Sequence, residues 1–206
     1  VSGSMKGDAI LKAHKQVLDM IEQDTDDTQF AIMTFGGKDF IRWAGIPESE
    51  EAEPGQPKPK PIPKGWAALP SKEARDKAEE FLKDIDADGD TPALDALQTA
   101  LKEEREKLSI VLISDGSFPV QQCGQFQPVI LSTQQWRIKN GFGPAVIMAY
   151  CVDLTSSEME VIGSVGGGGA YFAGWSKDAK PEDQLTPMVP LPPFGPIGPP
   201  IQNSVR

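Results

Sequence analysis

The chain has few of the residues on which most catalytic and covalent chemistry depends. Its 206 residues include two cysteines, Cys123 and Cys151, and a single histidine, His14. Two cysteines cannot build a disulfide framework, and one histidine leaves almost no ligands for a zinc site of the usual His and Cys type. A Ser-His-Asp triad would have to use His14, which falls inside a predicted helix. We therefore predict that the protein is not an enzyme.

Basic residues and long apolar runs are also scarce. Lysine and arginine number 20 against 30 acidic residues, and the formal net charge is −10. Because nucleic-acid phosphates demand Lys and Arg, this balance argues against a nucleic-acid partner. No apolar run approaches the roughly 18 residues that cross a bilayer, so no membrane span is predicted. Val1 opens no signal-peptide pattern, so we expect a processed chain or a fragment and leave its compartment unknown.

Helix-like and strand-like patterns alternate along the chain. Apolar residues that recur every three or four positions predict helices, and short apolar runs predict strands. Residues 109–113 form an apolar run typical of a parallel strand buried on both faces. This alternation predicts an α/β fold, doubly wound around a mainly parallel sheet. The predicted helices follow Met5, Ser71 and Thr91 and cover 129–139 and 157–165; the predicted strands are 28–35, 40–43, 109–113 and 145–152; 166–169 is a predicted turn into 170–172.

Two segments differ in composition from the rest. Residues of about 46–65 are acidic at first and then alternate proline with lysine, which is typical of a solvated, extended insertion. Residues 176–206 are rich in proline and poor in charge, so we predict a disordered tail. The domain itself is predicted to cover residues 1–175.

Three short motifs place side-chain oxygen atoms at the predicted ends of strands and helices. Ser2 and Ser4 precede the first helix, Thr91 opens another, and Asp115 follows the strand at 109–113. In a doubly wound fold, ligands bind at the carboxyl ends of the strands. We therefore expect these four side chains to meet at one edge of the sheet. Taken singly, each has an ordinary structural role, because serine and threonine cap helices and Asp-Gly forms turns.

Together, these motifs resemble those of the von Willebrand factor type A domain with a metal-ion-dependent adhesion site. The similar stretches are Val1-Ser2-Gly3-Ser4-Met5, Gly89-Asp90-Thr91-Pro92-Ala93-Leu94 and Leu112-Ile113-Ser114-Asp115-Gly116. The resemblance implies that a first aspartate and a central strand belong before Val1. Neither is in the chain, so we expect the 206 residues to fold poorly or bind metal weakly without an upstream extension.

The resemblance also implies a mechanism. Ser2, Ser4 and Thr91 would bind Mg²⁺ directly or through water, with Mn²⁺ or Ca²⁺ as alternatives, and Asp115 would act through water. Mg²⁺ prefers near-octahedral oxygen coordination and seldom takes every ligand from the protein. An acidic residue of a protein partner would then complete the coordination. The expected function is cation-dependent protein binding.

Two alternatives from other classes stay open. Asp84, Asp86, Asp88 and Gly89, with Asp95 at the twelfth place, imitate an EF-hand calcium loop, although the eighth and twelfth places do not fit well. The other alternative is a metal-independent scaffold, or a domain that assists an ATPase as a separate subunit. Gly166–Gly169 lacks a following Lys-Ser/Thr and does not match a phosphate loop.

Overall fold

The largest described sheet of this computed structural model contains three parallel strands. They are β5 (Ser109–Ser114), β6 (Val146–Cys151) and β7 (Gly167–Phe172), and the short strand β8 (Gln184–Thr186) pairs antiparallel with β7. The structure describes residues 3–23, 28–36, 39–46, 64–68, 71–85, 91–153, 156–172 and 184–186. The predicted α/β class with parallel strands is confirmed. Most of the predicted insertion and tail lies outside the described residues, although β8 falls within the predicted tail.

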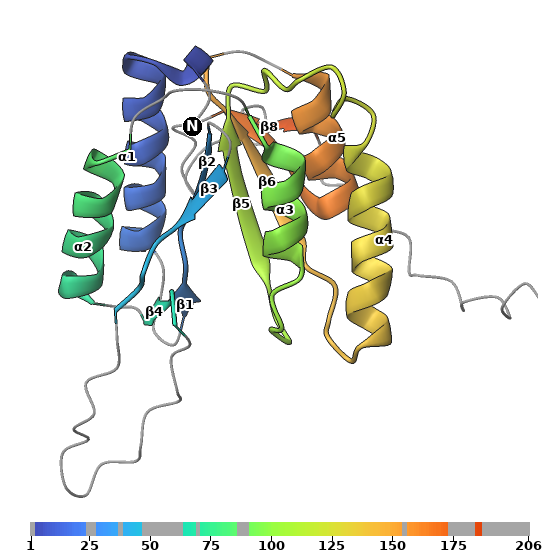
Figure 1. Ribbon diagram of the computed structural model, residues 1–206, viewed down its shortest axis with the longest axis horizontal. Helices are drawn as coiled ribbons and strands as arrows, with labels where there is room; N and C mark the ends of the chain where they lie inside the picture. Colours follow the sequence, from blue (N-terminus) through green and yellow to red (C-terminus); the bar gives the residue numbers. More distant parts are fainter. Residues whose placement is uncertain are drawn as a thin grey trace, which may run out of the picture.

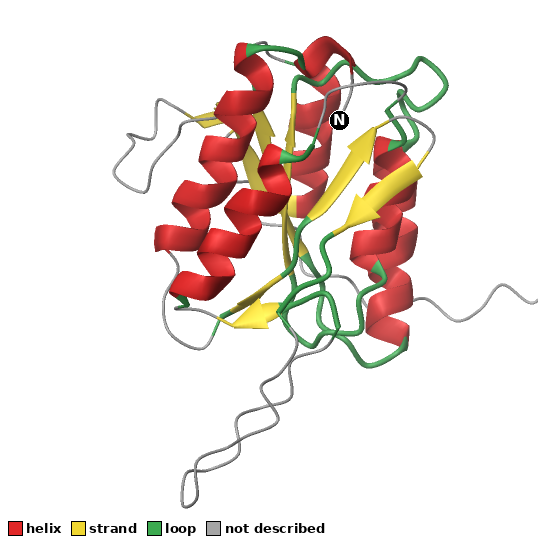
Figure 2. Ribbon diagram, turned by 60° about the vertical axis from the view of Figure 1, so that its left-hand side comes forward, coloured by secondary structure: helices red, strands yellow, loops and turns green. Residues whose placement is uncertain are grey.

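Helices lie on both sides of the strands (Figures 1 and 2). The 3₁₀ turn η1 (Gly3–Met5) leads into α1 (Asp8–Gln23), which packs beside α2 (Lys72–Lys83). On the other side are α3 (Ala93–Leu101), α4 (Phe126–Lys139) and α5 (Ser157–Gly166). Within the described ranges, no helix combines the length and apolar character of a membrane span.

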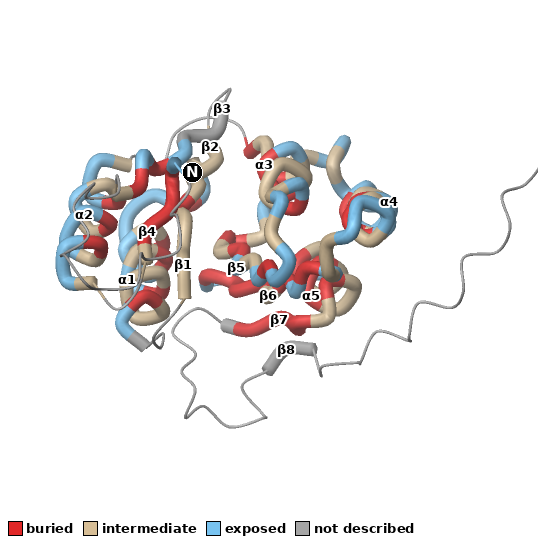
Figure 3. The backbone as a smooth tube through the Cα atoms, turned by 90° about the horizontal axis from the view of Figure 1, so that it is seen from below, coloured by how far each residue is buried: buried red, intermediate tan, exposed pale blue. Residues whose placement is uncertain are grey.

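The largest apolar cluster joins α3, α4 and α5 to one face of the parallel sheet. Its fully buried members include Leu101, Phe126, Ile147 and Met159. A second cluster joins α1 and α2 to the N-terminal strands. Figure 3 shows β5, β6 and β7 side by side, with α3 and α4 over the same face. Burial of apolar surface in these two clusters is the main force that holds the layers together.

The N-terminal strands are shorter than predicted. Instead of one strand over 28–35, the chain forms β1 (Gln29–Phe30) and β2 (Met33–Gly36). These pair antiparallel with β4 (Ala67–Ala68) and β3 (Asp39–Arg42), respectively. Residues 28–36 therefore contribute to two small sheets, with half-buried residues in both strands and the buried Ile32 between them. In the described residues, β2 has a partner only in β3, and β5 only in β6.

The prediction that residues 109–113 are buried on both faces is wrong. Leu112 is buried, whereas Ser109 and Val111 are exposed and alternate with residues that are less exposed. Helices α3–α5 cover one face. On the other face, Ile113 near the end of the strand packs against a cluster of residues from η1, α1 and the end of β6, namely Met5, Ala9, Ala13 and Val152. The apolar run predicts the strand correctly, but the burial of each strand face depends on which helices pack against it.

The predicted turn at 166–169 is reduced to Gly167, which is the left-handed C-cap of α5 and the first residue of β7. Gly166 ends α5, and the following glycines begin β7. A Cβ atom on Gly166 would lie 2.4 Å from Cβ of Ile147, and one on Gly168 would lie 2.4 Å from the carbonyl oxygen of Ile147. These glycines therefore allow α5 and β7 to approach β6 more closely than any side chain would permit. Their main role is close packing.

A buried arginine fixes the end of the molecule opposite to the carboxyl ends of the strands. Arg137, on α4, has no exposed surface. Its guanidinium donates hydrogen bonds of 2.6–3.0 Å to the carbonyl oxygens of Leu101, Glu103, Arg105 and Gly143. Burial lowers the pKa of this guanidinium. Because backbone carbonyls away from water need partners, Arg137 holds the turn after α3 and the segment before β6 in place.

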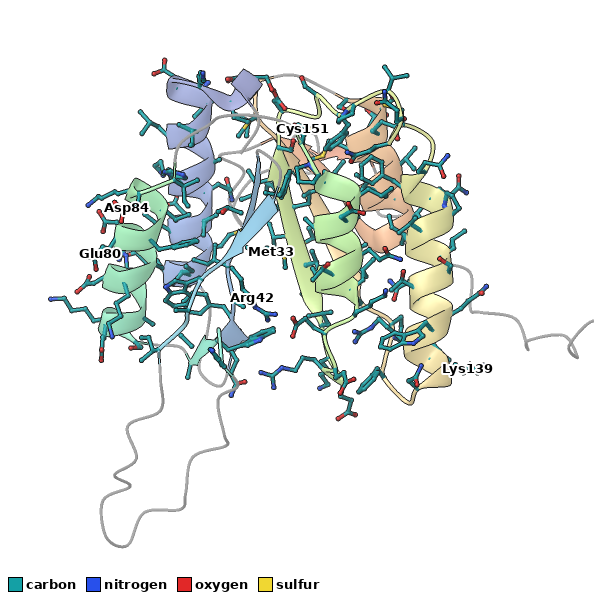
Figure 4. The ribbon with its side chains drawn as sticks, viewed as in Figure 1. Met33, Arg42, Glu80, Asp84, Lys139 and Cys151 are labelled. Carbon is teal, nitrogen blue, oxygen red and sulfur yellow. The ribbon has the colours of Figure 1, made fainter. Side chains whose placement is uncertain are left out.

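We predict that Arg137→Met lowers the free energy of unfolding by about 3 kcal/mol or more, because several inward-facing carbonyls would lose their donors. Lys139→Met is the matched control, since Lys139 lies two residues along the same helix and is exposed (Figure 4). Urea unfolding followed by circular dichroism measures both. Equal stability of the two variants would contradict the assignment.

Candidate functional site

The carboxyl end of β5 forms the first part of the candidate site. Asp115 follows β5 directly and is 7% exposed. Its Oδ1 accepts a hydrogen bond of 3.1 Å from the backbone N–H of Ser117, and Ser114 Oγ accepts one from the N–H of Gly116. Ser114 lies opposite Cys151 in the parallel pair. The turn therefore holds Asp115 close to the end of β6.

Gly116 makes this turn possible. Its φ is +74°, and a Cβ atom there would lie 2.2 Å from Cβ of Ser156. Ser156 Oγ donates a hydrogen bond of 3.2 Å to the carbonyl oxygen of Gly116. The turn after Asp115 is thus packed directly against the start of α5.

Thr91 lies just before α3 and is 4% exposed. Its carbonyl oxygen accepts hydrogen bonds from the N–H of Ala93 (2.8 Å) and from Nε2 of Gln122 (2.7 Å). Within the described ranges, the hydrogen bonds of Thr91 involve this carbonyl and leave its hydroxyl uncommitted. The predicted helix start was one residue early, because Pro92 is the N-cap and Ala93 the first helical residue. The hydroxyl of Thr91 does not cap α3.

Of the two predicted serine ligands, Ser2 lies outside the described residues. Ser4 is exposed on η1. Its neighbour Met5 is buried with Ala9 and Val152, and Ile113 packs on the same cluster. Ile113 lies two residues before Asp115, and Val152 directly follows β6. Because Met5 shares a cluster with both residues, η1 lies at the same edge of the sheet as Asp115. The top of Figure 1 shows η1 and the chain after β5 at this edge.

Cys151 also reaches this edge but is a poor ligand. It is fully buried. Burial raises the pKa of its thiol. Since a metal is bound by the thiolate, the neutral thiol favours a packing role. Hard oxygen ligands therefore dominate the candidate site.

Sequence reasoning missed Gln122. Its side chain bonds to the backbone on both sides of Pro92, at Thr91 and Leu94, although it lies 31 and 28 residues further along the chain. The segment from 121 to 125 contains three glutamines, and no spacing rule distinguishes Gln122 from Gln121 or Gln125. Only the folded arrangement identifies it.

The rival calcium loop stays a prediction. Asp86 and Asp88 lie outside the described residues. Asp84 is exposed at the end of α2 (Figure 4), and Asp95 is exposed in the first turn of α3. In the part of the chain that is described, no group of three or more His, Cys, Asp or Glu side chains could hold a metal ion. Among the described residues, the candidate site at the sheet edge has Asp115 as its carboxylate, and its other expected ligands are hydroxyls.

Comparison with known proteins shows the fold. No protein-family model matches the chain, and no curated protein sequence does. Among solved structures, it is similar to von Willebrand factor type A from Catenulispora acidiphila, with a TM-score of 0.53 and 17% sequence identity. The likeness covers 83% of this chain and 36% of that one, so the chain spans just over a third of its length. The chain thus has a fold like that of a von Willebrand factor type A domain.

We predict that Gly116→Ala is more destabilising than Gly124→Ala. Both glycines have φ near +75°, and a Cβ atom in that conformation costs about 1–2 kcal/mol. A Cβ on Gly116 would also meet Ser156, whereas one on Gly124 has nothing within 4 Å. Overpacking adds about 1–3 kcal/mol. Thermal unfolding of the two variants measures the difference, and equal losses would show that the contact with Ser156 is unimportant.

Proposed function

We propose that this chain is a divalent-cation-dependent protein-binding domain. Ser2, Ser4 and Thr91 would hold Mg²⁺ through their hydroxyls, with Asp115 acting through water, and Mn²⁺ or Ca²⁺ could substitute. An acidic side chain of a partner protein would complete the coordination. No bond is made or broken in this function. A von Willebrand factor type A-like fold, which suggests protein interaction, supports the proposal.

The environment of Asp115 is the observation that carries this proposal. The carboxylate is 7% exposed and accepts a hydrogen bond from Ser117. No salt bridge joins it to a basic side chain among the described residues. Burying a carboxylate without a compensating charge is costly. A cation beside Asp115 would offset that cost, and the hydroxyl of Thr91 would offer it a neutral oxygen.

Neutral hydroxyl ligands explain why a partner would be needed. Mg²⁺ demands near-octahedral oxygen coordination and dehydrates reluctantly. Three hydroxyls neutralise none of its charge, so an incoming carboxylate gains strongly. The adjoining loop also presents Val120 with 84% of its surface exposed. A partner could bury this side chain while its carboxylate reaches the ion.

We predict that Asp115→Asn weakens Mg²⁺ binding by at least about tenfold, because residues that act through a bound ligand typically contribute that much. Asparagine keeps an oxygen that can accept from Ser117, so the turn is preserved. Asp84→Asn, at the end of α2, is the control and should bind normally. Calorimetric titration of Mg²⁺ and then Ca²⁺ measures this, in a chain lengthened upstream of Val1.

Other outcomes would redirect the assignment. Ca²⁺ binding that is indifferent to Asp115 and lost in Asp84→Asn would move the ion to the EF-hand-like loop at 84–95. Absence of both Mg²⁺ and Ca²⁺ binding would leave a metal-independent scaffold or an ATPase-assisting domain.

We further propose that a strand leading into η1 lies between β2 and β5 and makes the sheet doubly wound. Each of these strands has one edge without a partner in the described residues. Helix α3 contacts both β2 and β5 and so covers the space between them. A strand that ends at η1 would end at the same edge as β5 and would run parallel to it. Backbone groups on both edges would then gain hydrogen-bond partners.

We predict that lengthening the chain upstream through this strand raises its stability and its affinity for Mg²⁺ together. The reason is that the added strand would pair the free edges and orient η1 at the candidate site. Chemical denaturation of the 206-residue chain and the longer chain provides the comparison. The proposal fails if the 206-residue chain already unfolds cooperatively, binds Mg²⁺ tightly and gains nothing from the extension.

A further inference from the structure

The side chain of Gln122 connects two parts of the candidate site. Its Oε1 accepts a hydrogen bond of 3.0 Å from the backbone N–H of Leu94, and its Nε2 donates one of 2.7 Å to the carbonyl oxygen of Thr91. Both polar atoms of one amide are thus bound to backbone groups on either side of Pro92. Because an amide offers a donor and an acceptor in a fixed plane, the pair of bonds sets both position and orientation.

The loop that carries Gln122 is itself anchored. The backbone N–H of Gln122 donates to the carbonyl oxygen of Pro119 (2.8 Å). Phe118 packs against Phe126, with ring centroids 4.8 Å apart. The N–H of Gly124 donates to the carboxylate of Glu158 at 3.3–3.4 Å. Gln122 is therefore presented from a loop tied to both α4 and α5.

The backbone N–H groups at the start of α3 need a hydrogen-bond acceptor from outside the helix. The first backbone N–H groups of a helix have no acceptors within the helix. Serine, threonine, aspartate and asparagine usually supply one from the N-cap, but the N-cap of α3 is Pro92, whose side chain has no polar atom. Gln122 supplies the acceptor for Leu94 from a distant part of the chain. It also restrains the residue that precedes the N-cap, which is Thr91.

We infer that Gln122 is a positioning residue that sets Thr91 relative to the turn containing Asp115, and this inference rests on the proposed function. The turn at 115–117 and Gln122 belong to one loop, and Thr91 belongs to another. The amide of Gln122 restrains the Thr91 backbone and thereby the direction of the Cα–Cβ bond from which the hydroxyl projects. Since Mg²⁺ tolerates little departure from octahedral geometry, this restraint determines whether both residues can serve one ion.

A metal-free measurement tests the two hydrogen bonds. Gln122→Met keeps the length of the side chain and removes both polar atoms. Gln121→Met is the matched control, because Gln121 is the exposed neighbour. Hydrogen exchange of the Leu94 amide should be at least about tenfold faster in Gln122→Met and unchanged in Gln121→Met, in line with a lost hydrogen bond of about 1.4 kcal/mol. Unchanged exchange in both variants would overturn the inference.

A titration with Mg²⁺, in the chain lengthened upstream of Val1, tests the connection to the ion. Gln122→Met should weaken Mg²⁺ binding about tenfold, as expected for a residue that orients a ligand. In a Thr91→Val background the same substitution should have no further effect, because Gln122 acts through Thr91. Independent, additive losses would overturn the positioning role. If the unaltered protein binds no Mg²⁺, the proposed function and the role toward the ion both fail, while exchange at Leu94 still tests the hydrogen bonds themselves.

Discussion

The buried guanidinium of Arg137 is the interaction on which the contact between the turn after α3 and the N-terminal strands depends. Its donors bind the carbonyls of Leu101, Glu103 and Arg105, which form the end of α3 and the turn that follows. The same turn reaches the N-terminal strands, because Arg105 donates to the Gln29 side chain and Glu103 forms an ion pair with Arg42. Both of these contacts are partly solvated and contribute little by themselves. They depend on a turn whose backbone Arg137 already holds in place.

Helix α3 is consequently fixed at both ends by side chains from later in the chain. Arg137 binds the carbonyls at and beyond its C-terminus, and Gln122 binds the N–H of Leu94 at its N-terminus. Gln134, one turn before Arg137 on α4, makes a similar pair of bonds to the N–H and carbonyl of Ala145. Each of these side chains satisfies backbone groups that lie at the ends of regular elements. The core sets the layers, and these polar side chains set the positions of their ends.

The sequence predicts the elements of the fold better than it predicts the residues that position the candidate site. Periodicity identifies α2, which follows Ser71 as predicted, and Ser71 caps the helix by accepting a hydrogen bond from the N–H of Ala74. Helix α4 begins three residues before the predicted start, because Pro128 is tolerated in a first turn, where its missing N–H would have no partner. Exposure of Val111 could not be foreseen, since cover of a strand face depends on which helices pack there. Thr91 and Asp115 were recognisable from their motifs, whereas Gln122 acts through tertiary contact and leaves no local pattern.

The position of α3 links the stability of the fold to the candidate site. Thr91 precedes α3, and α3 contacts both β2 and β5. A strand between β2 and β5 would therefore pack beneath the same helix that Thr91 precedes and would end at η1, which contains Ser4. The same strand would then pair the sheet edges and place the hydroxyl ligands. Because a hard ion binds well only when all its ligands are in place, a fold with open edges at β2 and β5 should hold the ion less tightly than one in which they are paired.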